Sequence, residues 1–118
     1  MPTCRLDESI GAVRERVKKA GWNACVVVND ERVVFGLLRS KELAQGNDEP
    51  VEKAMRPAPS TFRPFVPIEE MAAYMAEHDV ENCPITTSDG RLVGLLRKED
   101  AIQGAHVLHE MAHRPKEA

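Results

Sequence analysis

The stretch Gly36-Leu37-Leu38-Arg39 recurs 58 positions later as Gly94-Leu95-Leu96-Arg97. Sliding the chain by the same interval aligns residues 3–46 with 61–104 without a gap. Six further pairs are identical: Thr3/Thr61, Arg5/Arg63, Ile10/Ile68, Cys25/Cys83, Gln45/Gln103 and Gly46/Gly104. A repeat of this length is a whole supersecondary unit, which usually packs against its copy to close a core. The chain is therefore predicted to be one small unit written twice.

The first copy is predicted to contain two helices and a β-hairpin between them. Apolar residues at helical spacing indicate a helix over 8–20. The apolar, β-branched segments 25–28 and 33–38 flank a polar turn and predict the hairpin. Ser40 belongs to the residue types that cap helices, so a second helix is expected over 41–46.

The second copy repeats this order. A helix is expected over 67–79, strands over 83–86 and 92–96, and a longer helix over 98–112. With a short strand opening each copy, the pattern predicts an α+β fold of two β-α-β-β-α repeats. We expect the repeats to be related by a pseudo-twofold axis and to pack through their sheets.

Proline and polar residues mark the segment between the copies as a connector, in which only 51–55 is expected to form a helical turn. The predicted organisation is a first repeat over 1–46, a connector over 47–58, a second repeat over 59–113 and a tail over 114–118.

Composition narrows the class of protein. The chain has 118 residues, a net charge of −3 and largely dispersed basic residues, which disfavours a nucleic-acid partner. No apolar run approaches the roughly 18 to 20 residues that span a bilayer, so no membrane association is expected. Three cysteines and no signal peptide favour a reduced, cytoplasmic protein. Cys25 and Cys83 are expected to be buried, which leaves Cys4 as the candidate reactive thiol.

The element order, the repeat and two local segments resemble a known family. Val51-Glu52-Lys53-Ala54-Met55-Arg56-Pro57 and Val80-Glu81-Asn82-Cys83-Pro84-Ile85 look like parts of a tandem pair of cystathionine-β-synthase (CBS) domains, a Bateman module. The resemblance covers nearly the whole chain. It implies a regulatory, ligand-sensing module with two clefts that bind adenosine-containing ligands such as AMP, ATP or S-adenosylmethionine.

The resemblance also implies site residues. In the family a Gly-x-x-Thr/Ser-x-x-Asp pattern closes each copy, and its Asp holds the ribose. Asp100 matches this position, whereas the first copy has the longer Glu42. Arg39 and Arg97 replace the Thr/Ser, so each guanidinium either reaches a ligand phosphate or fills its cleft. A third alternative is a surface pair between Arg97 and Asp100.

By position, the better-matched cleft is expected to be lined by Thr61, Val80, Pro84, Ile85, Arg97 and Asp100. The weaker cleft would contain Thr3, Trp22, Val26, Arg39 and Glu42. Trp22 is either a platform for a stacked base or ordinary core filling, and the sequence leaves both open.

The segment His109-Glu110-Met111-Ala112-His113 spells the H-E-x-x-H pattern of zinc proteases. Pro115 follows at once and no substrate cleft is indicated, so a catalytic or metal site is not expected. The alternatives are adventitious metal binding that includes His106, a solvated helix end, or a subunit contact.

No catalytic set emerges, so an enzyme and a resident cofactor are not expected. Two functions remain: a module that senses an adenosine nucleotide as regulatory ligand, and a dimerisation or protein-interaction module whose clefts are empty or blocked by arginine. A homodimer is expected, because the last helix carries an apolar stripe that includes Leu108 and Met111. The regulated protein is not identified by the sequence.

Overall fold

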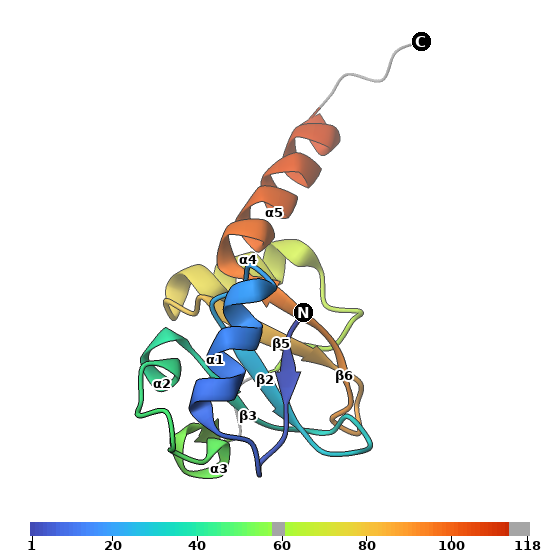
Figure 1. The fold of residues 1–118 in the computed structure, drawn as a ribbon. Coiled ribbons are helices and arrows are strands. Elements are labelled where there is room, and N and C mark those ends of the chain that lie inside the picture. Colours follow the sequence, from blue (N-terminus) through green and yellow to red (C-terminus); the bar gives the residue numbers. More distant parts are fainter. Residues whose placement is uncertain (58–60, 114–118) are drawn as a thin grey trace.

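The structure is a computed structural model that describes residues 1–57 and 61–113, with side-chain environments up to residue 105. Two similar α+β units follow one another along the chain (Figure 1). The elements are β1 (Thr3–Cys4), α1 (Ile10–Lys19), β2 (Cys25–Val28), β3 (Val34–Leu38), α2 (Ser40–Leu43), α3 (Val51–Ala54), β4 (Arg56–Pro57), α4 (Ile68–Glu77), β5 (Asn82–Thr86), β6 (Leu92–Arg97) and α5 (Lys98–His113).

The first unit is a four-stranded sheet in the order β1-β2-β3-β4, covered on one face by α1. The helix buries Ile10, Val13 and Val17, which recur at helical spacing and confirm the predicted apolar stripe. They pack against Val27 and Leu38 of the sheet, and both of these side chains are fully buried. This cluster is the core of the first unit.

The segment expected as a connector lies against the first unit. The predicted helical turn forms as α3, and Val51 is fully buried in the first core. β4 then adds an antiparallel strand to β3, with Gly36 opposite Pro57. A Cβ atom at Gly36 would lie 2.5 Å from the sulfur of Met55 and 3.0 Å from the backbone carbonyl oxygen of Arg56, so a larger residue would force β4 or Met55 to shift. The first sheet is therefore completed by residues beyond 46.

The second unit has the helices and the hairpin that the sequence predicts, but a smaller sheet. β5 and β6 form a two-stranded antiparallel sheet, against which α4 and α5 pack. The expected opening strand is reduced to a single parallel bridge between Phe62 and Ile85. Pro64 follows two residues later and lacks an amide donor, which limits further pairing.

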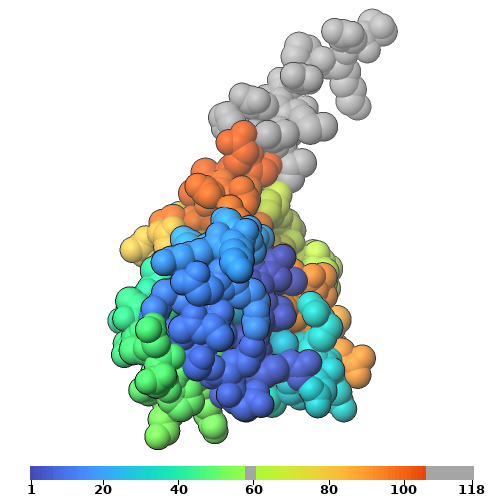
Figure 2. Space-filling view, in the orientation of Figure 1, coloured from blue at the N-terminus to red at the C-terminus, as the bar shows by residue number. Residues whose placement is uncertain are grey.

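The two sheets pack face to face around a pseudo-twofold axis, as predicted. Val26 and Leu37 of the first sheet share a buried cluster with Leu92 and Leu95 of the second. At the hairpin turns, the amide of Val34 donates to the carbonyl of Gly90 at 3.0 Å. The amide of Leu92 donates to the carbonyl of Arg32 at 2.8 Å, the same bond with the copies exchanged. Figure 2 shows the turn after β2 against residues of the second unit.

The twofold-related residues Arg32 and Gly90 both adopt a positive φ, of 66° and 86°. Glycine takes this conformation freely, whereas arginine is strained there. We expect Arg32→Gly to raise the free energy of unfolding by about 0.5–1 kcal/mol. Gly90→Ala, whose Cβ would meet only Val33 at 3.6 Å, should lower it by about 1 kcal/mol. Urea unfolding of both variants measures these changes, and equal effects of the same sign would contradict the prediction.

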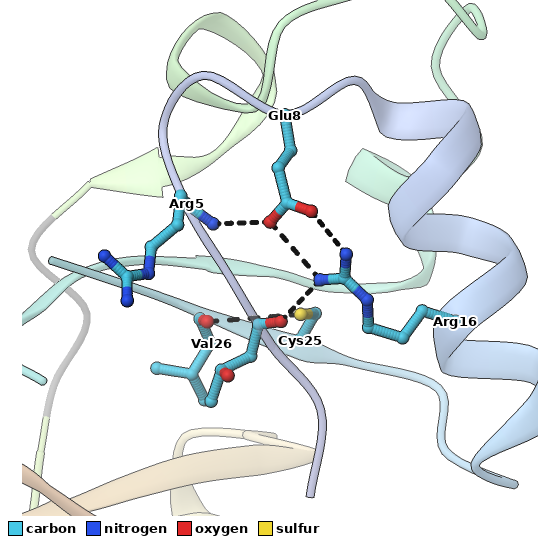
Figure 3. Close-up of polar contacts among 6 residues, drawn as sticks. Arg5, Glu8, Arg16, Cys25 and Val26 are labelled. Carbon is cyan, nitrogen blue, oxygen red and sulfur yellow. Dashed lines mark hydrogen bonds and ion pairs between the residues drawn. The ribbon is translucent and has the colours of Figure 1, made fainter. Parts of the chain in front are cut away.

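Glu8 joins the loop before α1 to the helix and to β1 (Figure 3). Its carboxylate accepts hydrogen bonds from the Arg5 amide at 2.8 Å and from the guanidinium of Arg16. Arg16 also donates to the carbonyl of Thr3 at 2.8 Å. The hydrogen bonds from Arg16 are the main reason that the pKa of Glu8 lies below its ordinary value of 4.5.

This lowered pKa predicts a pH dependence of stability. Because the folded pKa is depressed, Glu8 contributes stability above about pH 4.5 and loses it as the pH falls through the folded value. Glu8→Gln should therefore be less stable than the wild type near pH 6, and the difference should shrink near pH 3. Chemical unfolding at both pH values measures the difference. A difference that does not change with pH would contradict the role of the charge.

Several smaller expectations need correction. The second helix is shorter than 41–46, and its N-terminus is capped by Arg39 and Glu42 because the Ser40 hydroxyl donates instead to the carbonyl of Asn23. Cys4 is not a reactive thiol, because it is buried and its hydrogen bond with Cys25, together with burial, raises its pKa.

The metal and dimer hypotheses for residues 106–113 concern side chains outside the described part. None of the helices, as far as the structure describes them, has the length and apolar character to cross a bilayer.

Candidate functional site

A pocket of about 510 Å³ lies between the two units. One wall comes from the end of β3, the start of α2 and β4, and the other from the end of α4 and the start of β5. Its size falls within the range of small-molecule sites, roughly 300–1,000 Å³. The lining residues are Asn23, Leu37, Arg39, Ser40, Lys41, Arg56, Tyr74, His78, Asp79, Val80, Glu81 and Asn82.

Asn82 is the most informative residue of this pocket. It opens β5 and is only 6% exposed. Its Oδ1 atom is buried and has no hydrogen-bond partner within the described residues. A buried acceptor without a donor costs about 1–3 kcal/mol. Asn82 lines the pocket, so a ligand donor that reaches this atom would complete its hydrogen bonding.

Basic side chains without a carboxylate partner give the pocket a positive wall. Lys98 is 3.0 Å from both Asp79 and Glu81, so it offsets the two acidic residues at the rim. Lys41 and Arg56 line the opposite wall, and no ion pair joins either to another described residue. This arrangement favours an anionic group on the side of the first unit.

Arg39 is folded onto Glu42 and does not point freely into the pocket. Its Nε donates to the carboxylate at 2.7 Å and its Nη2 at 3.0 Å. The Arg39 amide donates to the same carboxylate at 3.1 Å, which closes a capping box at α2. Burial alone raises the pKa of Glu42, but the hydrogen bonds and charge of Arg39 outweigh it and the pKa is lowered. Glu42 is therefore an anion already satisfied by its neighbour.

Arg97 makes a different contact from Arg39, its counterpart 58 positions earlier. Its guanidinium carbon lies 3.9 Å from the centre of the Trp22 ring, a cation–π contact. Asp100 is exposed on the first turn of α5, and neither a hydrogen bond nor an ion pair joins it to Arg97. The alternative of an Arg97–Asp100 surface pair is wrong.

The site residues are grouped differently from the two clefts that the sequence predicts. Val80 faces Arg39 in the large pocket, and Trp22 faces Arg97, so each arginine meets a residue of the other copy. The pseudo-twofold packing causes this exchange, because it sets the start of the last helix of one unit against the helix–strand loop of the other. A sequence repeat contains no information about which copy supplies which wall.

The other predicted residues lie apart from the large pocket. Val26 is part of the core between the sheets, and Pro84 is fully buried in β5. Ile85 is half-buried beside Phe62, and Thr3 belongs to β1. Thr61 lines a separate depression of about 360 Å³, where Arg63 donates to its hydroxyl.

Three pocket residues were not predicted as site residues: Asn82, Arg56 and His78. Asn82 lies in the segment that resembles the family, and the first copy has Ala24 at the equivalent position. A polar residue that replaces a buried alanine of the copy is a usable signal for a site. Arg56 and His78 lie on β4 and at the end of α4, and only the packing of the two units brings them together.

Comparison with known proteins agrees with this architecture. The sequence model of the CBS domain matches residues 51–106. The solved structure of CBSX2 in complex with AMP has a TM-score of 0.82 and 18% identity over 92% of this chain and 90% of that one. The CBS domains of a transcriptional regulator from Streptococcus pneumoniae give a TM-score of 0.78, at 18% identity over 86% of both chains.

A third similar structure is the cytosolic domain of the Mg²⁺ channel MgtE in complex with ATP, with a TM-score of 0.77 and 23% identity. The match covers 86% of this chain but only 44% of that one. The CBS-domain match is thus confined to residues 51–106, and the two units together have the fold of a CBS-domain pair.

Proposed function

We propose that this chain is a ligand-sensing regulatory module that binds an adenosine-containing ligand, such as AMP or ATP, in the pocket between the units. The observation that carries the proposal is that Asn82 lines the pocket and that its buried Oδ1 has no hydrogen-bond partner among the described residues. The exocyclic amine of adenine is a donor of the kind that this atom lacks, whereas guanine presents an acceptor at the same place. Base recognition by Asn82 would therefore select adenine over guanine.

Other features of the pocket support the same ligand class. The rings of Tyr74 and His78 lie 4.3 Å apart at one wall, beside the apolar Val80, and offer a surface for a flat base. Lys41 and Arg56 line the wall across from them and suit a phosphate. The similar structures that contain AMP and ATP make these nucleotides the first candidates. A regulatory rather than catalytic role is part of the proposal.

A thermal-shift panel of AMP, ADP, ATP, NAD, S-adenosylmethionine and GMP tests this function. At 100 times the dissociation constant, binding to the folded state alone adds about 2.7 kcal/mol. For a chain of 118 residues this raises the melting temperature by on the order of 10 °C. We expect a shift with at least one adenine compound and a much smaller shift with GMP. No shift with any compound at millimolar concentration would contradict the proposal.

The alternative is a dimerisation or protein-interaction module with blocked clefts. The observation in its favour is that both cleft arginines already have partners, Arg39 on Glu42 and Arg97 on Trp22. A negative thermal-shift panel would make this the better proposal. Self-association is compatible with either function. Ile102 on α5 is 46% exposed, and a second copy of the chain could cover it. A monomeric mass at tens of micromolar by light scattering would contradict the homodimer.

A further inference from the structure

The repeated arginine of the second copy lacks the carboxylate that its counterpart has in the first. In the first copy, Arg5 forms an ion pair with Asp30 at the turn between β2 and β3. The residues 58 positions later are Arg63 and Ser88, so a hydroxyl takes the place of the carboxylate. The second copy therefore keeps the positive charge without its negative partner.

Arg63 forms no ion pair with the described residues. A second carboxylate beside Arg5, that of Glu8, accepts a hydrogen bond from the Arg5 amide at 2.8 Å (Figure 3). The corresponding residue of the second copy is the apolar Val66. None of the ion pairs in the described part of the chain includes Arg63. A half-buried guanidinium is thus left without a carboxylate to balance its charge.

Hydroxyl groups line the depression around this guanidinium. The Nη1 atom of Arg63 donates to the hydroxyl of the buried Thr86 at 2.7 Å and to that of Thr61 at 3.2 Å. Both residues line the depression of about 360 Å³, together with Ser88. Each hydroxyl keeps its own proton to donate, and none of the described residues accepts one from Thr61 or Thr86. The depression therefore offers a guanidinium and three hydroxyl donors to a ligand.

Asp89 is the one acidic residue among the described residues that line this depression. Its carboxylate accepts a hydrogen bond from the Thr87 hydroxyl and lies 3.5 Å from the Nε atom of Arg91. The Asp89 side chain is 63% exposed, so water and salt screen its charge. Asp89 therefore weakens the attraction of Arg63 for an anion but does not cancel it.

We propose that the depression around Arg63 is a binding site for a phosphate group, separate from the pocket beside Asn82 and independent of the function proposed for that pocket. The bound oxyanion takes the place that the Asp30 carboxylate has in the first copy. Arginine, serine and threonine are common partners of phosphate oxygens. Donors from three positions of the chain surround a tetrahedral group better than they surround a flat carboxylate.

Inorganic phosphate is the probe, titrated at constant ionic strength with chloride as the reference anion. In the wild type, phosphate should raise the melting temperature and shift the amide NMR signals of residues 86–90. Arg63→Gln should weaken phosphate binding by roughly 10- to 150-fold, because it removes hydrogen bonds from a charged donor. Arg5→Gln is the matched control and should leave the response to phosphate unchanged. Arg63→Lys, which keeps the charge but not the planar fork, replaces the glutamine variant if that one does not fold.

Ser88→Asp gives the most specific result, because it restores the carboxylate that Arg5 has in Asp30. This variant should melt at a higher temperature than the wild type without phosphate, and phosphate should no longer shift its melting temperature. Asp89→Asn should bind phosphate more tightly than the wild type, because it removes the negative charge at the rim. Glycerol phosphate is titrated in parallel: tighter binding than that of inorganic phosphate assigns the site to a phosphate monoester, and weaker binding assigns it to the free ion.

No response of the wild type at tens of millimolar phosphate would overturn the proposal. An equal response in Arg63→Gln would also overturn it, as would NMR shifts confined to Lys41 and Arg56, which line the large pocket. An equal response of the wild type to acetate would contradict the tetrahedral ligand class.

Discussion

Leu38→Ala is expected to lower the free energy of unfolding by about 2–5 kcal/mol, the range for buried leucines that leave a cavity. Leu38 is fully buried between α1 and the first sheet, in the core that also contains Val51. Small proteins have a total stability of about 5–15 kcal/mol, so this loss is a large share of it. Calorimetry should record a melting temperature lower by on the order of 10 °C.

Leu96, the equivalent residue of the second copy, is the matched control. It is only half-buried beside the core of the second unit, so Leu96→Ala should cost clearly less. The ratio of the two losses tests whether the first unit contains the better-closed core. A larger loss for Leu96→Ala would contradict the account of the two cores.

Asn82→Leu is expected to separate stability from ligand binding. Leucine has the same branched shape and removes the buried Oδ1 that lacks a partner among the described residues, so the free energy of unfolding should rise by about 1–2 kcal/mol. The same change removes the proposed acceptor for the adenine amine, and nucleotide binding should be lost. Urea unfolding and the nucleotide thermal shift measure the two effects on one variant.

Asn23→Leu is the control for this pair of effects. Asn23 lines the same pocket but is exposed, so its replacement should bring little change in stability. A destabilised Asn82→Leu protein that still binds nucleotide would show that Asn82 has a structural role only. A gain in stability with unchanged binding would place the ligand elsewhere.

The repeat of Gly36-Leu37-Leu38-Arg39 predicted most of the fold. The 58-residue interval predicted the two units, the hairpins and the helices. The backbone hydrogen bonds to the carbonyls of Arg32 and Gly90 are also related by this interval. Two features were beyond the pattern. The short strand β4 pairs with β3 through a proline-rich segment that reads locally as a loop. The opening strand of the second unit is a single bridge at Phe62, because Pro64, two residues later, has no amide donor to extend the pairing.

The candidate site was less predictable than the fold. The sequence predicted five of the residues discussed here: Val80, Arg39, Glu42, Trp22 and Arg97. Their grouping depends on how two sheets pack across a twofold axis. The sequence also cannot show that Arg39 is anchored by Glu42 while Arg97 lies on an indole. Both depend on which neighbours the fold places within reach of a long, flexible side chain.

The most direct test of the proposed function is calorimetric titration of AMP into the wild type and into Asn82→Leu. The account predicts one AMP bound per wild-type chain, in the pocket beside Asn82, and no measurable binding to a folded Asn82→Leu protein. Equal binding to both proteins, or no heat with the wild type at millimolar AMP and ATP, would contradict it.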